Sequence, residues 1–321
     1  MPVWGGPAAP DRDPHPRTPH LFGNGTVVTT QISLETRPKP LSSALQRHPR
    51  GRLAALLSLP MVWLVGVYIL SLALMLVTAF WETDPFTSKV KPGFTLDNFA
   101  SIFTVPAYFG AALRTLGIAL TVTVVCAVLA VPLAIFMAKL AKPWLRAVLA
   151  VAVTLPLWAG YLVKILSVRI VFSEQGFFNW LFGPLGIQSP GYGIVVTIIA
   201  LIYLWFPYMA IPVYTAVSQI PANLFDASSD LGAKGLRTIS TVVVPLLKPA
   251  LIAGSIFTFS LSLGDFLAAK FVGGSTQMIG TIISSNINLN PPVAAAFSVV
   301  PIVLVLIYLL AVRRTGALEN L

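Results

Sequence analysis

Long apolar segments constrain the fold of this chain more than any other feature. About 20 apolar residues suffice to cross a bilayer as a helix. We predict six spans, at roughly 53–80, 110–137, 147–171, 194–216, 249–270 and 293–312. Because lipid offers backbone groups no hydrogen-bond partner, such spans predict an all-α membrane protein. Prolines within several spans predict kinked helices in a bundle.

Composition agrees with this fold class. The 321 residues are 56% hydrophobic and only 10% charged, which is typical of membrane proteins. The net charge of +10 does not indicate nucleic acid, because the basic residues gather in the N-terminal tail and beside apolar runs. There they act as topology-setting charges. The single cysteine, Cys126, excludes a disulfide within the chain, and we expect it to pack in the core.

Three regions differ in composition. Residues 1–50 are rich in Pro, Arg, His, Thr and Ser, and we expect a disordered cytoplasmic tail. Residues 51–314 form the predicted transmembrane domain, and residues 315–321 a short cytoplasmic C-terminal tail. With the N-terminus inside, most of the 21 lysines and arginines fall on the inner side. This excess predicts that both termini and the loop 217–248 are cytoplasmic.

The loop 217–248 carries a helical pattern of its own. A set of small or mildly apolar residues recurs at spacings of three and four, so its members share one predicted helical face. These residues are Leu224, Ala227, Ser228, Leu231 and Gly232. Such a face suits a groove on another protein better than burial in lipid. A capped amphipathic helix on the membrane surface is the alternative that the pattern alone leaves open.

The spacing of this loop matches a known pattern. It reads Asp226-Ala227-Ser228-x-x-x-Gly232-x(9)-Val242-x-Val244-Pro245. This resembles the signature loop E-A-A-x-x-x-G-x(9)-I-x-L-P of permease subunits of ATP-binding-cassette (ABC) importers. Asp226, Ser228, Val242 and Val244 differ from the residues of the pattern. Gly232 and Pro245 match it and keep their spacing.

Other segments resemble one branch of these permeases, which serves importers of spermidine and putrescine. The segments 95–99, 155–158 and 262–266 carry the likeness, which covers about residues 53–312. It implies a type I importer permease fold in a bacterial inner membrane. It also implies a second permease in a heterodimer, two ATPase subunits and an extracytoplasmic substrate-binding protein.

The resemblance implies that the loop is a coupling helix docked on an ATPase. The implied coupling residues are Leu224, Asp226, Ala227, Ser228, Leu231, Gly232 and Pro245. This chain has no G-x-x-x-x-G-K-[ST] phosphate loop, so ATP and Mg would be used by the partner ATPase. The three histidines all lie in the N-terminal tail. We therefore expect a transport subunit with no catalytic residue, no metal site and no cofactor.

Asp265 is the leading candidate for the substrate pathway, because charges within spans are costly and usually face protein or a watery cavity. A carboxylate there would meet a cationic amine, with cation–π support from aromatic rings. The aromatic candidates are Trp158, Tyr161, Trp205 and Tyr208. Convergence of two or more on Asp265 would indicate an amine site. An internal ion pair or a helix cap for Asp265, and lipid-facing positions for the rings, are the alternatives.

Charges on the third and fifth spans complete the candidates. Glu174 is expected at the outer mouth, where it contacts substrate or binding protein or is simply solvated. Lys164 and Arg169 are expected to contact the partner permease or Glu174. Lys270 lies near the outer end of its span and is expected to reach the interface.

We expect the importer to carry a small amine-type solute, with a polyamine such as spermidine or putrescine favoured. A zwitterionic, amino-acid-like solute is one alternative, because Lys270 is awkward beside a purely cationic substrate. An ion-coupled secondary transporter is another, although it predicts inverted repeats with broken helices, and no clear repeat is visible.

Overall fold

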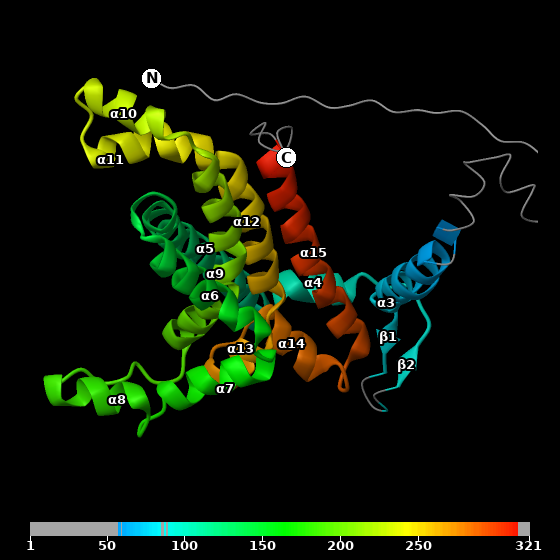
Figure 1. The fold of residues 1–321 in the computed structure, drawn as a ribbon. Coiled ribbons are helices and arrows are strands. Elements are labelled where there is room, and N and C mark those ends of the chain that lie inside the picture. The colour runs from blue at the N-terminus through cyan, green and yellow to red at the C-terminus, as the bar shows by residue number, and fades with distance from the viewer. Residues whose placement is uncertain (1–56, 59, 85–86, 88, 314–321) are drawn as a thin grey trace, which may run out of the picture. The chain divides into compact units, whose positions relative to one another are not determined.

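The structure is a computed structural model that describes residues 57–313 except 59, 85–86 and 88. The predicted tails, residues 1–50 and 315–321, lie outside the described residues. The chain divides into two compact units, Met1–Met61 and Val62–Leu321. The described helices and strands belong almost entirely to the second unit (Figure 1).

Five helical segments of the described chain are long and apolar enough to cross a membrane. They are Pro60–Thr78, Pro106–Leu140, Ile194–Gln219, Ile239–Gly264 and Pro291–Arg313. A sixth candidate consists of two helices, Pro143–Trp158 and Tyr161–Val171, which are bent by 105° at a short break. The predicted helical membrane protein is therefore confirmed, but the third predicted span is not one straight helix.

The elements follow one another along the chain as helices with one small hairpin. The first span holds the π-helix η1 (Leu64–Ile69) and α3 (Leu70–Thr78). Then come β1 (Glu82–Thr83), β2 (Val90–Lys91), α4 (Asp97–Thr104), α5 (Pro106–Ile135) and the π-helix η2 (Phe136–Leu140). The middle of the chain forms α6 (Pro143–Trp158), α7 (Tyr161–Val171), α8 (Phe177–Phe182), the 3₁₀-helix η3 (Gly183–Leu185) and α9 (Ile194–Gln219).

The last third contains the remaining helices. They are α10 (Ala222–Asp230), α11 (Gly235–Thr238), the π-helix η4 (Ile239–Val243), α12 (Val244–Gly264), α13 (Leu267–Val272), α14 (Ile279–Asn286) and α15 (Pro291–Arg313). Helix α12 therefore ends at Gly264. The predicted fifth span, 249–270, is wrong in running through Asp265, because the backbone there turns to an extended conformation (ψ 117°).

Helices α5, α9 and α12 pack together as the centre of the bundle, and their contacts are made by small and aliphatic side chains. Cys126 is fully buried there, in the packing role predicted for it. Helices α9 and α12 approach each other closely at Gly254 of α12. A Cβ atom at Gly254 would lie 2.7 Å from Sδ and 3.0 Å from Cα of Met209 on α9. Only glycine lets the two helices approach this closely.

Polar contacts fix the segment between the first two spans. The strands β1 and β2 pair in antiparallel fashion, with Glu82 opposite Lys91. Asn98 of α4 donates from Nδ2 to the carbonyl oxygens of Ala79 (2.9 Å) and Trp81 (2.8 Å). This buried amide satisfies backbone groups where the first span ends.

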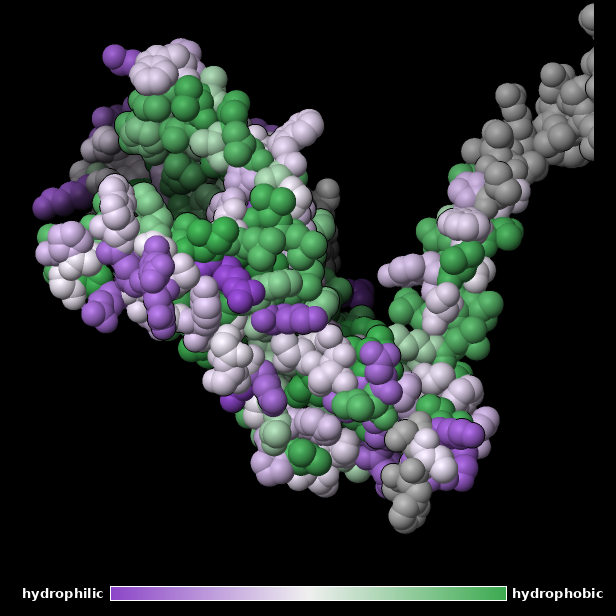
Figure 2. All heavy atoms as spheres, turned by 90° about the horizontal axis from the view of Figure 1, so that it is seen from below, coloured by the Kyte–Doolittle hydropathy of each residue, from purple (hydrophilic) through white to green (hydrophobic). Residues whose placement is uncertain are grey.

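The two ends of the second unit carry different elements. Figure 1 places α10, α11 and the C-terminal end of α15 at one end, and α7, α8, α13, α14 and the hairpin at the other. Figure 2 views this other end from below and shows hydrophilic residues gathered across its centre. The loop with the coupling pattern therefore lies at the opposite end from the broken helices.

Candidate functional site

The segment with the coupling pattern forms a short helical hairpin. Pro221 is the N-cap of α10, which suits its fixed φ and missing N–H. The helix ends at Asp230, and Gly232 follows in the left-handed conformation with φ +79°. Gly232 turns the chain toward α11, η4 and then α12. Gly232 therefore forms the turn between two short helices.

The predicted single face of this helix is wrong in part. Leu231 and Gly232 lie beyond the end of α10, and the Leu231 side chain is 89% exposed. Ser228 is buried, and its Oγ lies 2.8 Å from Oγ1 of Thr238 on α11. The 3.6-residue pattern placed these residues on one face because it assumed that the helix continued through the glycine.

The remaining coupling candidates are open to a partner. Leu224, Asp226, Ala227 and Pro245 are all exposed. With Leu231, the exposed candidates Leu224 and Ala227 give α10 and the turn after it small and apolar side chains beside charged ones such as Asp226 and Asp230. Such a surface suits a groove on another protein.

Asp265 lies at the interruption between α12 and α13, and it is only 5% exposed. Its Oδ1 accepts a hydrogen bond from the Ala268 amide at 2.9 Å, as an N-terminal cap does. Its Oδ2 accepts a hydrogen bond from the Tyr161 hydroxyl. No ion pair to Asp265 is present among the described residues. Of the alternatives, the helix cap is therefore present and the internal ion pair is not.

Two of the predicted aromatic residues converge on this carboxylate. The Tyr161 ring, at the start of α7, stacks on Trp205 of α9 with centroids 6.0 Å apart. A pocket of about 320 Å³ opens beside them. Its lining consists of Tyr161, Trp205, Ser260, Leu261, Gly264, Asp265, Phe266 and Leu267. We call this the Asp265 pocket.

The other two predicted rings do not line the pocket. Trp158 is 90% exposed on α6 and faces away from the bundle. Tyr208 packs against Trp205, with the two ring centroids 5.8 Å apart, and does not itself line the pocket. Phe266 and Ser260 do line it and were not among the predicted site residues. Phe266 follows Asp265 directly and lies in the segment 262–266, so the resemblance of that segment could have identified Phe266 as a site residue.

Glu174 lies outside this pocket. It is exposed and lines a separate polar hollow of about 590 Å³, with Asn179 and Ser189 among the other residues there. Of the two contacts predicted for Lys164 and Arg169, the one with Glu174 is absent, because no such ion pair exists in the described chain; the contact with a partner permease stays a prediction.

The basic side chains near the breaks have other neighbours. The guanidinium of Arg169 lies 5.7 Å from the Tyr192 ring centroid. Lys164 is 7% exposed on the inner face of α7. Lys270 is exposed, and its Nζ lies 5.9 Å from the Phe266 ring centroid. The predicted reach of Lys270 toward the membrane interface stays a prediction.

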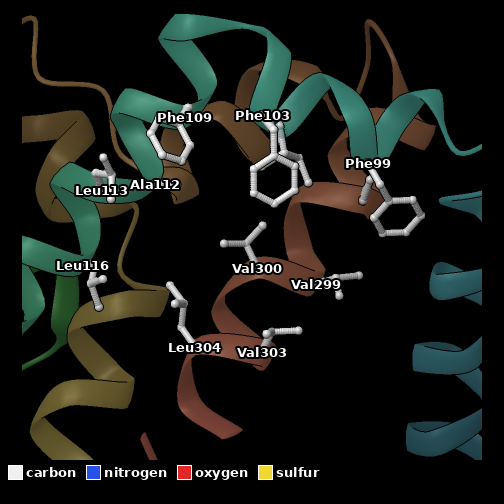
Figure 3. Close-up of a pocket in the computed structure, with 12 residues that line it drawn as sticks. Phe99, Phe103, Phe109, Ala112, Leu113, Leu116, Val299, Val300, Val303 and Leu304 are labelled. Atoms are coloured by element: carbon white, nitrogen blue, oxygen red, sulfur yellow. The ribbon is translucent and has the colours of Figure 1, made fainter. Parts of the chain in front are cut away.

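A third hollow is purely apolar and lies between α4, α5 and α15 (Figure 3). Its volume is about 310 Å³. Phe99, Phe103 and Phe109 surround one side, and Val300 and Val303 of α15 the other (Figure 3). Because no charged group lines it, this groove does not suit a charged solute. The Asp265 pocket is therefore the candidate substrate site. In the described residues, no group of three or more His, Cys, Asp or Glu side chains is placed to hold a metal.

Comparison with known proteins identifies the family of the chain. The family described as "Binding-protein-dependent transport system inner membrane component" matches residues 130–316. The permease protein YdcU of Escherichia coli (strain K12), an inner membrane ABC transporter component, is 37% identical over 298 residues, covering 88% of this chain and 95% of that one. The spermidine/putrescine permease PotB of the same organism is 32% identical over 265 residues, covering 80% and 95%.

Solved structures share the fold. A bacterial ABC transporter that imports the acidic polysaccharide alginate matches with a TM-score of 0.68 at 18% identity, covering 85% of this chain and 98% of that one. The same kind of transporter, in complex with its alginate-bound periplasmic protein, matches with a TM-score of 0.70 at 17% identity, covering 86% and 96%. At this identity the likeness shows the fold alone.

The relatives are transport components rather than enzymes. The family match extends over more than half of the chain, and the curated relatives cover most of its length. Helices able to span a membrane fit an inner membrane protein with several spans. The chain therefore belongs to the family of binding-protein-dependent transport system inner membrane components, and it is a permease subunit of an ABC importer resembling PotB.

Proposed function

We propose that this permease conducts a small organic cation, with a polyamine such as spermidine or putrescine favoured. The observation that carries the proposal is the Asp265 pocket, where two stacked aromatic rings and one buried carboxylate meet. An ammonium group gains from a ring face and from a nearby negative charge. The name of PotB, a spermidine/putrescine permease, supports the same substrate class.

Asp265 has two roles in this proposal. It caps α13 through Ala268 and accepts the Tyr161 hydroxyl. Both contacts hold the carboxylate in place. A cation in the pocket would favour the charged form of this carboxylate and be attracted by it, while its hydrogens are free to contact the rings and Ser260.

A zwitterionic, amino-acid-like solute is the second candidate. Lys270 favours it, because its exposed ammonium lies beside Phe266, which lines the pocket. A solute with a carboxylate would gain from Lys270, whereas a polyamine would be repelled by it. Uptake of each solute separates the two candidates.

We propose six spans with α6 and α7 counted as one, and both termini in the cytoplasm. The shared position of α10, α11 and the end of α15 supports this orientation (Figure 1), as does Arg313 in the last turn of α15. Helix α10 would dock on one of two ATPase subunits that hydrolyse ATP with Mg. A second permease would complete a heterodimer, and an extracytoplasmic binding protein would dock at the end that carries Glu174.

The test uses Trp205 variants in cells that express the complete transporter. Trp205→Phe keeps a ring in the pocket, and Trp205→Leu removes it. We expect Trp205→Leu to raise the half-saturating polyamine concentration clearly more than Trp205→Phe, because cation–π attraction contributes on the order of 1 kcal/mol or more. Equal uptake curves for wild type and Trp205→Leu would contradict an aromatic amine site.

A further inference from the structure

Lys139 connects three elements at the end of the bundle that carries α10. It lies in η2, the last turn of the second span. Its Nζ donates a hydrogen bond to the carbonyl oxygen of Ile220 at 2.5 Å, directly after the end of α9. The same Nζ lies 5.6 Å from the ring centroid of Phe225 in α10. One ammonium group of the second span thus contacts both the end of α9 and α10.

Each contact has a physical reason. The last carbonyl groups of a helix have no partner within the helix, and the partial negative charge there favours a cation. The ring of Phe225 attracts the same ammonium, while its other side packs against the main hydrophobic core. Lys139 and Phe225 therefore anchor α10 to the bundle from its inner side.

The second span is also fixed on its other side. Arg146 of α6 donates from Nε to the carbonyl of Met137 (2.9 Å) and from Nη2 to that of Ala138 (3.2 Å). By contrast, Lys142 is exposed, and its side chain makes no polar or ring contact within the described chain. Lys139 and Arg146 therefore do more than set topology, and Lys142 provides a matched control.

We infer that Lys139 is a positioning residue that transmits movement of α10 to the second span. The inference rests on the proposed docking of α10 to an ATPase. Along the chain, α10 is joined only to α9 and, through α11, to α12. Lys139 adds a direct link to α5, so that a displacement of α10 also moves α5, one of the central helices.

The experiment compares Lys139→Met, Lys139→Arg and Lys142→Met in the purified complete transporter in proteoliposomes. It measures solute transported per ATP hydrolysed, and co-purification of the ATPase. Met keeps the length of the side chain and loses the charge. We expect Lys139→Met to lower transport per ATP at least about fivefold, the lower end for coupling free energies, with co-purification unchanged. Lys139→Arg restores most of the coupling, and Lys142→Met behaves as wild type.

Phe225→Leu provides a second variant, which keeps an apolar side chain and removes the ring. We expect Phe225→Leu to lower transport per ATP as Lys139→Met does. The double variant should transport only slightly less solute per ATP than Lys139→Met alone. Unchanged transport per ATP in Lys139→Met or in Phe225→Leu would overturn the inference. So would an equal loss of coupling in Lys142→Met. If the docking proposal itself is wrong, the ATPase will co-purify with a permease whose α10 is disrupted. That result differs from the results that would overturn the role of Lys139.

Discussion

The Tyr161 hydroxyl donates a hydrogen bond to the Asp265 carboxylate, and this contact joins two interruptions in different helices. Tyr161 is the first residue of α7, after the break that follows α6, and Asp265 comes directly after α12. The helices beyond the two breaks, α7 and α13, lie in contact with each other. One partly buried polar contact therefore ties both broken segments together beside the candidate substrate pocket.

Removal of the charge at Asp265 tests its role in the pathway. In Asp265→Asn the side-chain oxygen is still able to accept from the Ala268 amide, so the cap on α13 persists. We expect the half-saturating polyamine concentration for uptake to rise about tenfold, the equivalent of about 1.4 kcal/mol.

Tyr161→Phe provides the matched control for this experiment, because it removes the hydroxyl and keeps both the ring and the charge. It should have the smaller effect on half-saturation. An Asp265→Asn transporter with an unchanged concentration dependence would leave Asp265 as a structural cap and nothing more.

The turn after α10 depends on the conformation of Gly232 rather than on space. Its φ is +79°, and a Cβ atom there would meet nothing within 4 Å. A β-branched residue is strained in this region by about 1–2 kcal/mol, whereas Asn tolerates it better. We therefore expect Gly232→Val to reduce uptake and ATPase co-purification strongly, and Gly232→Asn to retain most of both. Equal behaviour of Val and Asn would show that the left-handed turn is not required.

At Gly254 the constraint is the space available for a side chain, whereas at Gly232 it is the backbone conformation. Gly254→Ala places a methyl group against Met209, and overpacking of this kind costs about 1–3 kcal/mol. We expect a lower midpoint of thermal unfolding for the purified transporter. Gly117→Ala on α5 is the control, since a Cβ atom there meets nothing within 4 Å and alanine favours helix. Similar midpoints for the two variants would argue against close packing of α9 and α12.

Much of the fold was predictable, because hydrophobicity over about 20 residues reports the presence of a span directly. The prolines predicted kinks, but not the positions of the breaks. The residues from Trp158 to Tyr161 carry no charge, so hydropathy over about 20 residues does not reveal the 105° bend between their helices. The sequence singled out Asp265 and left a helix cap as one of several roles, and it did not show that a new helix, α13, begins directly after it. Periodicity also failed at Gly232, because it cannot detect where a helix ends.

The sequence predicted the types of residue in the candidate site, but only some of the residues that form it. Tyr161 and Trp205 meet Asp265 because the bend after α6 brings the start of α7 against α13 and α9. Trp158, only three residues earlier, lies before the bend and points outward. Which aromatic residues converge thus depends on a backbone change that single-sequence patterns do not encode.

The most direct test of this account is ATP-driven uptake of labelled spermidine by the complete transporter in proteoliposomes. The account predicts uptake that requires ATP on the ATPase side and that Asp265→Asn weakens at low spermidine concentration. A transporter that hydrolyses ATP and imports another class of solute, with no uptake of spermidine or putrescine, would contradict it.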